Sequence, residues 1–214
     1  ESLKSWILNQ YKDNRTPKYP HNMEAIKPDN TTTIATADKE GNIVNLLTSL
    51  GNNFGSKVVV PDTGIVLNDH MCNFDPVPGR PLSLGPTRRP PPGAHVPIFF
   101  RDDKAYLAID APGARRSMSG VLHTIINCID FGIGVQAATE YPRVWAEAFY
   151  EESFLDSYIP DSIQSDLVKL GHKIVPMEPS TSGGFGRPTA VSIDSSGLIH
   201  AGADPMYNTG TAGF

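Results

Sequence analysis

The 214-residue sequence contains few of the residues from which metal sites and disulfide frameworks are built. Its two cysteines, Cys72 and Cys128, have no close-pair metal spacing and are too few for a disulfide-rich scaffold. We expect two free, mostly buried thiols, because buried cysteine usually serves packing. The six histidines include no HxH or HxxxH pair, so neither a metal ion nor another cofactor is expected.

Long apolar runs and an excess of basic charge are also missing. No apolar stretch approaches the roughly 20 residues of a membrane-spanning helix, and the first residues do not read as a signal peptide. The formal net charge is -5, and the basic pairs at 88–89 and 115–116 are short. We therefore expect neither a membrane nor a nucleic acid as a partner. The compartment stays open, with the cytoplasm favoured over the periplasm or secretion.

Two regions of different character meet near residue 30. Residues 3–11 predict a short helix, and residues 13–30 are polar with three prolines, which is typical of an extended linker or arm. From residue 31 the sequence changes to strand-like runs separated by turn residues. The length suits one domain with a core of its own and an N-terminal appendage.

Hairpins and helices alternate with one long loop after residue 30. Alternating apolar runs around a turn predict hairpins at 31–50, 98–110 and 189–204, and a further strand at 64–69. Apolar residues at helical spacing predict helices within 111–133, 135–141 and 160–172. Residues 75–97 carry eight prolines and three glycines, which predicts an ordered loop or lid. This order indicates an α+β fold with antiparallel sheet and helices packed on a face.

The first hairpin opens with Thr31, Thr32 and Thr33. Threonine is β-branched, so strand propensity alone explains most such triplets. Alternatively, one threonine becomes a new N-terminus after cleavage, and its α-amine, with a pKa of roughly 7.7–8.0, serves as the base for its own hydroxyl. That chemistry is acyl transfer, and it needs backbone N–H donors for an oxyanion. The Pro112-Gly113 turn could provide them, or it is simply a turn.

A series of ordered motifs follows Asn30: TTTIATADKEGNIV, SLGNNFGS, TGIVLNDHMCNFD, PGRP, GPTRRP, DAPGARR, NCIDFGIGVQAATEYPRV and GADPMYNTGTAGF. Together they resemble the small, C-terminal subunit of the γ-glutamyltranspeptidase family. The resemblance implies half of the αββα sandwich of the N-terminal nucleophile hydrolases. It implies that residues 1–30 are the tail of the large subunit or a pro-segment, and that residues 31–214 are the small catalytic subunit. The large subunit of the same precursor would be the partner, and a dimer of the two-subunit unit is compatible with the resemblance.

The resemblance implies roles for the residues of the catalytic side. Thr31 would be the nucleophile and the new N-terminus, with cleavage between Asn30 and Thr31. Ser49 would be the second hydroxyl that orients the nucleophile. Gly113 and Ala114 stand where a Gly-Gly pair supplies the oxyanion N–H groups in the family, and alanine retains its backbone N–H.

The substrate side departs from the family pattern. Gly51 stands in place of an asparagine, while His70 and Asn73 replace a glutamine and an aspartate that hold the α-amino group of the substrate. Gly93 and His95 fall where the family has a Ser-Ser pair for the α-carboxylate, and both histidines are candidate substrate contacts. Loss of the aspartate removes a charged hydrogen bond worth about 1.5–3 kcal/mol. The departures predict a small-molecule amide substrate whose acyl group lacks a free α-amine, as in related cephalosporin acylases or oxamate amidohydrolases.

Three other functions stay open at this point. The chain could belong to a true γ-glutamyltransferase or glutathione hydrolase. It could be a non-catalytic relic of the fold, against which the intact Thr31 argues. It could also be an enzyme with Cys72 or Cys128 as nucleophile, although neither cysteine has a base nearby in sequence.

Overall fold

The computed structural model describes residues 30–90, 95–146, 151–178, 184–206 and 209–214. The helix expected within 3–11, the polar segment up to residue 29 and Gly93 lie outside these ranges. In chain order the described elements are β1 (Thr31–Ala37), β2 (Ile43–Ser49), the 3-10 turn η2 (His70–Asn73), β3 (Ile98–Arg101), β4 (Lys104–Asp110), the 3-10 turn η3 (Ala114–Arg116), α2 (Ser117–Ile129), α3 (Val135–Glu140), β5 (Val144–Ala146), β6 (Glu152–Asp156), α4 (Asp161–Lys169), β7 (Lys173–Met177), β8 (Thr189–Ile193) and β9 (Ile199–Ala203).

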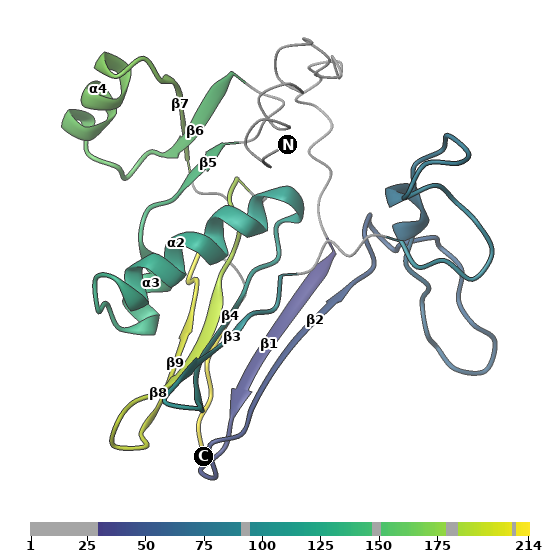
Figure 1. Ribbon diagram of the computed structural model, residues 1–214, viewed down its shortest axis with the longest axis horizontal. Helices are drawn as coiled ribbons and strands as arrows, with labels where there is room; N and C mark the ends of the chain where they lie inside the picture. The colour runs from purple at the N-terminus through teal and green to yellow at the C-terminus, as the bar shows by residue number, and fades with distance from the viewer. Residues whose placement is uncertain (1–29, 91–94, 147–150, 179–183, 207–208) are drawn as a thin grey trace, which may run out of the picture.

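Three layers build the body of the molecule (Figure 1). The middle layer is a four-stranded antiparallel sheet in the order β3-β4-β8-β9. Helices α2 and α3 cover one face of it, and the β1–β2 ribbon packs on β4 and β8. The three predicted hairpins, the helices predicted within 111–133, 135–141 and 160–172, and the α+β class are therefore confirmed.

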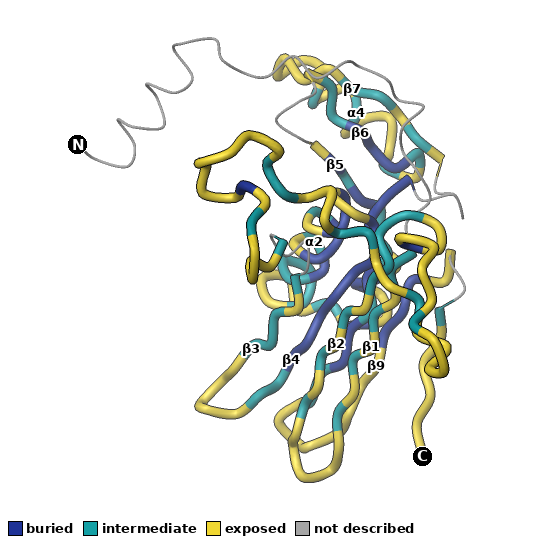
Figure 2. The backbone as a smooth tube through the Cα atoms, turned by 90° about the vertical axis from the view of Figure 1, so that its right-hand side faces the viewer, coloured by how far each residue is buried: buried dark blue, intermediate teal, exposed yellow. Residues whose placement is uncertain are grey.

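The core lies between the helices and the middle sheet. Leu107 and Ile109 of β4 are buried against Val121 of α2 and Val135 of α3. Alternate residues of a strand point to opposite faces, so Ala108, between Leu107 and Ile109, faces the ribbon instead. Figure 2 shows that β4 is buried along most of its length, whereas the hairpin tips are exposed.

The β1–β2 ribbon has one half-buried and one exposed face. Its pairing register places Thr31 opposite Ser49 at one end and Ala37 opposite Ile43 at the other. Burial alternates along both strands, as expected when one face of a ribbon packs on a sheet. The other face carries large apolar side chains that are about half exposed: Ile34, Val44 and Leu46.

Asn45 joins the ribbon to the middle sheet. The Ile109 N–H donates to the Pro97 carbonyl at 3.4 Å, but proline has no N–H to donate back to the Ile109 carbonyl. The side-chain N–H₂ of Asn45 replaces it, donating to Ile109 O at 3.0 Å and to Pro97 O at 3.2 Å. Asn45 of β2 thereby supplies the hydrogen bond that Pro97 cannot donate, and this contact holds the ribbon against the middle sheet.

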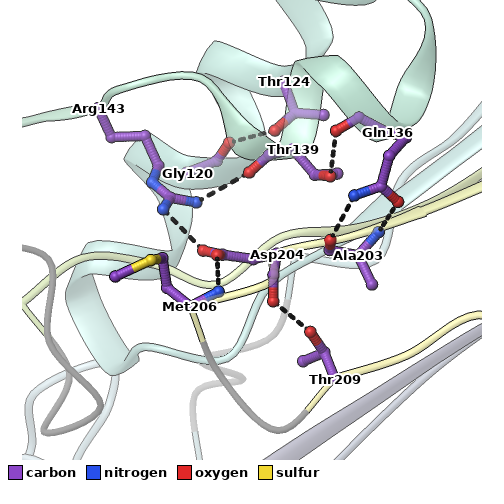
Figure 3. A network of polar contacts seen from close by, with 9 residues as sticks. All are labelled: Gly120, Thr124, Gln136, Thr139, Arg143, Ala203, Asp204, Met206 and Thr209. Carbon is purple, nitrogen blue, oxygen red and sulfur yellow. Dashed lines mark hydrogen bonds and ion pairs between the residues drawn. The ribbon is translucent and has the colours of Figure 1, made fainter. Parts of the chain in front are cut away.

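A buried ion pair fastens the end of β9 to the helical layer (Figure 3). Arg143 Nη2 lies 2.6 Å from Asp204 Oδ2, and both side chains are almost fully buried. Arg143 also donates to the Thr139 carbonyl at the end of α3. Gln136 of α3 adds two hydrogen bonds to the backbone of Ala203, one as donor and one as acceptor. Buried charges are tolerated when they are paired in this way.

Several predictions about local structure were incomplete or wrong. Strands β5, β6 and β7 form a second, three-stranded sheet with a parallel β6–β7 pair that the sequence analysis missed. Residues 64–69 form only an isolated bridge, Val59 to Val66, because the chain turns back through Asp62 and Gly64 in left-handed conformations. Cys128 is half-buried, but Cys72 is exposed in η2, contrary to the expected burial.

The long loop between β2 and β3 was predicted correctly as irregular. Within residues 75–90 and 95–97 the chain has no helix or strand, and Asp75 and Ser83 form one bridge. Across the described part of the chain, no helix combines the length and apolar character that spanning a bilayer requires.

Candidate functional site

A pair of hydroxyl groups lies at the end of the β1–β2 ribbon. Thr31 begins β1 and Ser49 ends β2, and because the two residues are paired, their side chains share a face. Thr31 Oγ1 lies 2.9 Å from Ser49 Oγ. The N–H of Gly51 donates to Ser49 Oγ at 3.1 Å. Ser49 therefore has a fixed donor on one side and the Thr31 hydroxyl on the other, which orients Thr31.

The peptide bond before Thr31 is held in the same ribbon. The Asn30 carbonyl accepts a hydrogen bond from Leu50 N–H at 3.0 Å, and Asn30 N–H donates to Gly51 O at 3.2 Å. The carbonyl carbon that a self-cleavage step would attack is thus fixed beside the Thr31 hydroxyl. Its oxygen already has an N–H donor.

Gly51 adjoins a carboxylate that the sequence analysis missed. The φ of Gly51 is +83°, and a Cβ at this position would come within 1.9 Å of Asp69 Oδ1 and 3.1 Å of His70 Cδ2. Asp69 accepts hydrogen bonds from Asn52 N at 3.1 Å and from Asn52 Nδ2 at 2.5 Å. The side-chain bond from Asn52 is the main cause that lowers the pKa of Asp69. An ionised carboxylate therefore fills the space beside Gly51, close to Ser49.

The turn that follows β4 presents two backbone N–H groups that have no acceptor among the described residues. Gly113 and Ala114 have φ angles of +144° and +50°, so the chain reverses sharply before α2. Within the described part of the chain, neither of their backbone N–H groups has a hydrogen-bond acceptor. N–H groups at a helix start are available to bind an oxyanion.

Close glycine packing fixes that turn. A Cβ on Gly113 would lie 2.8 Å from Gly186 Cα, and a Cβ on Gly186 would lie 2.7 Å from the Arg116 carbonyl oxygen. Arg187 N–H also donates to Pro112 O at 2.9 Å. The segment before β8 thus presses directly on the turn, so neither glycine has room for a side chain.

The turn and the hydroxyl pair lie at the same end of the molecule. Asp110, the last residue of β4, pairs with Thr189 of β8. Thr189 Oγ1 in turn lies 3.0 Å from Thr33 Oγ1, two residues after Thr31. The start of β1 and the end of β4 are therefore neighbours, although about 80 residues separate them in sequence.

The remaining candidate residues are less closely connected to the hydroxyl pair. Asn73 is exposed at the end of η2, with its side-chain oxygen 3.7 Å from Cys72 Sγ. His95 is half-buried in the loop before β3. Burial raises the pKa of Cys128 to about 11, so this thiol is protonated near neutral pH and is a poor nucleophile. Among the residues described, no group of three or more His, Cys, Asp or Glu side chains could hold a metal ion.

The comparison with known families agrees with this geometry. The family model described as Gamma-glutamyltranspeptidase matches residues 2–214. The chain belongs to the gamma-glutamyltranspeptidase family. The resemblance drawn from the motifs is thus confirmed.

Two curated members of this family are named after different activities. The chain is 34% identical over 173 residues to the acylase ACY 1 proenzyme of Pseudomonas sp. strain SE83, covering 81% of this chain and 30% of that protein. It is 32% identical over 184 residues to the glutathione hydrolase proenzyme of Bacillus subtilis strain 168, covering 86% and 30%. The chain therefore spans about a third of the length of these gamma-glutamyltranspeptidase relatives.

Solved structures of the family share the fold. Cephalosporin acylase from Bacillus halodurans superposes with a TM-score of 0.74 at 26% identity, over 97% of this chain and 39% of that one. The gamma-glutamyltranspeptidase of Pseudomonas nitroreducens complexed with L-DON gives a TM-score of 0.72 at 23% identity, over 86% and 98%. The expected N-terminal nucleophile hydrolase architecture is thus confirmed, and this chain supplies one helical layer and two layers of strands to it.

Proposed function

We propose that this chain is the catalytic part of an amide hydrolase that is cut between Asn30 and Thr31 and then uses Thr31 as its nucleophile. The observation that carries the proposal is the 2.9 Å contact of Thr31 Oγ1 with Ser49 Oγ, beside the Asn30 carbonyl. Residues 1–30 are then the tail of the large subunit or a pro-segment, and residues 31–214 are the small subunit.

The self-cleavage step follows from the position of Asn30. Thr31 Oγ1 attacks the Asn30 carbonyl carbon, the C–N bond breaks, and the acyl group passes to the hydroxyl as an ester while the α-amine of Thr31 is freed. The Leu50 N–H, 3.0 Å from the Asn30 oxygen, stabilises the negative charge that develops there. Water then hydrolyses the ester and leaves a carboxylate on Asn30.

Substrate hydrolysis repeats this chemistry with an external amide. The freed α-amine takes the proton of Thr31 Oγ1, while Ser49 holds the hydroxyl in place. The oxygen attacks the substrate carbonyl, and the N–H groups of Gly113 and Ala114 bind the oxyanion. The leaving amine departs with the proton, and water hydrolyses the resulting ester. The intact Thr31 and its ordered surroundings argue against a non-catalytic relic.

The acyl group of the substrate is proposed to lack a free α-amine. Asn73 carries no charge and is exposed, and Gly51 has no side chain to offer a ligand. His70 lies beside Gly51, and His95 lies in the loop before β3. Gly93, outside the described residues, stays a further candidate contact. The acylase named among the relatives is compatible with such a substrate.

One observation favours a second candidate function, that of a true gamma-glutamyltransferase or glutathione hydrolase. The Asp69 carboxylate stands beside Gly51, so negative charge is present near the hydroxyl pair although Asn73 carries none. A carboxylate in this position attracts a substrate ammonium. The glutathione hydrolase relatives match this chain about as well as the acylases do.

The large subunit of the same precursor is the proposed partner. The curated relatives are named as proenzymes and are about three times as long as the matched part of this chain. The half-exposed apolar face of the ribbon, with Ile34, Val44 and Leu46, supports a covering layer from outside this chain.

The two candidate functions differ in the acyl group that they accept. The processed two-subunit protein is given γ-glutamyl-p-nitroanilide and glutaryl-p-nitroanilide, and release of p-nitroaniline is measured with and without glycylglycine. Preference for the glutaryl compound supports the first candidate. Preference for the γ-glutamyl compound, with transfer to glycylglycine, overturns it in favour of the second.

A further inference from the structure

The carboxyl group of Asp110 is buried at the end of the strand that leads into the Gly113 turn. The residue has no exposed surface within this chain alone. Its Oδ1 accepts a hydrogen bond from Ala111 N–H at 2.7 Å, whereas its Oδ2 is buried and has no partner in the described part of the chain. A buried carboxylate with one oxygen unsatisfied is costly when it is ionised.

The side chain of Asp110 points towards the β1–β2 ribbon. Its neighbours Ile109 and Ala111 belong to the core beneath the helices, so Asp110 faces the opposite side of the sheet. Its cross-strand partner Thr189 contacts Thr33 through their hydroxyl groups. Asp110 thus lies between the two strand layers, beneath the start of β1.

A second unsatisfied acceptor lies in the same layer. The N–H₂ of Asn45 donates to the Ile109 carbonyl, which is bonded directly to the Asp110 backbone nitrogen. The side-chain oxygen of the same amide, Asn45 Oδ1, is buried without a partner among the described residues. Two buried acceptors, Asp110 Oδ2 and Asn45 Oδ1, therefore belong to side chains on either side of the Ile109–Asp110 peptide bond.

Both oxygens lack a hydrogen-bond donor among the described residues. We propose that Asp110 is a positioning residue whose neutral carboxyl donates a hydrogen bond to Asn45 Oδ1 and so holds the ribbon of Thr31 and Ser49 against the strand that enters the Gly113 turn. This inference rests on the proposed function, because positioning matters only if Thr31 and the turn act together. Thr31 belongs to the β1–β2 ribbon, whereas the Gly113 turn follows β4 of the middle sheet. The bond from Asp110 to Asn45 holds the ribbon on that sheet.

The surroundings of Asp110 favour its neutral form up to a pH of about 6. Burial raises the pKa of Asp110 to about 6, against the opposing effect of the Ala111 N–H bond. The ribbon residues that face it, Asn45 and Thr33, are uncharged, as is Thr189 of β8. In the turn, Arg116 directs its Nε to the Gly113 carbonyl at 3.2 Å. After cleavage the α-amine at the start of β1 also faces this layer, and its positive form favours ionisation of Asp110.

The sign of the pH effect follows from the raised pKa. The neutral form is favoured in the folded state, so the stabilisation is complete below the ordinary aspartate pKa of 3.8. It is lost as the pH rises from there through about 6. Above that range the folded protein carries a buried charge beside Asn45.

The test uses the full-length processed protein and its Asp110→Asn variant. Asparagine keeps an N–H donor for Asn45 and cannot ionise. We expect the variant to melt at a higher temperature than wild type at pH 8, with the difference vanishing at pH 4. Replacement of the exposed Asp62 by asparagine is the control and should show no such pH dependence. An Asp110→Asn variant that melts below wild type at pH 8 overturns the proposed proton.

Kinetics test the positioning role separately. In wild type we expect the pH profile of kcat to show one group, Asp110, whose ionisation lowers the rate. We expect the Asp110→Asn variant to lack it, and Asp110→Leu to lose roughly tenfold in kcat at every pH through misplacement of the reacting groups. An unchanged kcat profile in Asp110→Asn overturns the positioning role. If wild type hydrolyses neither anilide, the proposed function fails, and the melting data still decide whether Asp110 holds a proton.

Discussion

The Thr31 hydroxyl lies 2.9 Å from the Ser49 hydroxyl, across the end of the β1–β2 ladder. The register of the ladder sets this contact, because it places the first residue of β1 directly opposite the last residue of β2. Ser49 receives the Gly51 N–H at the same time. The proposed nucleophile is thus oriented by backbone pairing rather than by a mobile loop.

Substitutions of Thr31 and Ser49 should separate the role of the nucleophile from that of the hydroxyl that orients it. We expect Thr31→Ala to abolish both self-cleavage and hydrolysis, and Thr31→Ser to retain both because it keeps a hydroxyl at the same place. Ser49→Ala should process slowly and lose roughly ten- to a hundredfold in kcat, since the nucleophile is less well aligned. Mass spectrometry for a fragment that starts at Thr31 measures processing. A Thr31→Ala protein that is cut and active as wild type would contradict the proposal and favour a relic or another nucleophile.

The contact between Gly51 and Asp69 predicts a non-additive pair of substitutions. Gly51→Ala places a Cβ where Asp69 Oδ1 stands and strains a φ of +83°, so the side chain of Asp69 must leave its bonds to Asn52. We expect Gly51→Ala to lower both the melting temperature and kcat/KM. The double variant with Asp69→Ala removes the clash with the carboxylate. Its loss of stability should therefore be smaller than the sum of the two single losses, by about 0.5–3 kcal/mol. Strict additivity in a thermal or urea double-mutant cycle would contradict this packing.

The Gly113–Gly186 contact predicts a catalytic effect of a distant residue. Gly186→Ala introduces a Cβ within 2.7 Å of the Arg116 carbonyl, which displaces the turn that bears the N–H donors. We expect a loss in kcat of the order of 10²-fold with a smaller change in KM, because oxyanion donors act in the transition state. Gly134→Ala is the matched control, since a Cβ there meets nothing within 4 Å. Equal kinetics for the two variants would show that the turn does not depend on this packing.

The buried Arg143–Asp204 pair predicts a large loss of stability. Asp204→Ala leaves the Arg143 guanidinium buried and without its carboxylate, which we expect to cost about 3–5 kcal/mol of unfolding free energy. Asp166→Ala is the control, because its ion pair with Lys169 on α4 is exposed and should contribute little. Urea denaturation of both variants measures the difference. Similar small losses in the two would mean that water reaches Arg143 in the variant.

The charge of Arg143 also affects its neighbour His123. Burial, and then the charge of Arg143, lower the pKa of His123, whose Nδ1 accepts the Val144 N–H at 3.4 Å. The histidine is therefore mainly neutral near pH 7. It supports the start of β5 and is far in the chain from the proposed nucleophile.

Local patterns were enough to predict the hairpins and the helices. Turn residues between alternating apolar runs specify the β1–β2, β3–β4 and β8–β9 pairs, because such pairs form between neighbours in sequence. The three strands β5 to β7 were missed because they are short and are paired partly in parallel across α4. Nothing within each of these segments indicates its partner.

The sequence by itself determined the family, the hairpin that opens with Thr31, and the candidate roles of Ser49, Gly113 and Ala114. Only the tertiary structure decided that Asp69 fills the space beside Gly51 and that Asn45 replaces the missing N–H of Pro97. The first contact joins residues 18 positions apart, and the Asn45 side chain reaches residues 52 and 64 positions away. These contacts depend on how the layers stack, and stacking is set by side-chain packing over the whole core rather than by local spacing.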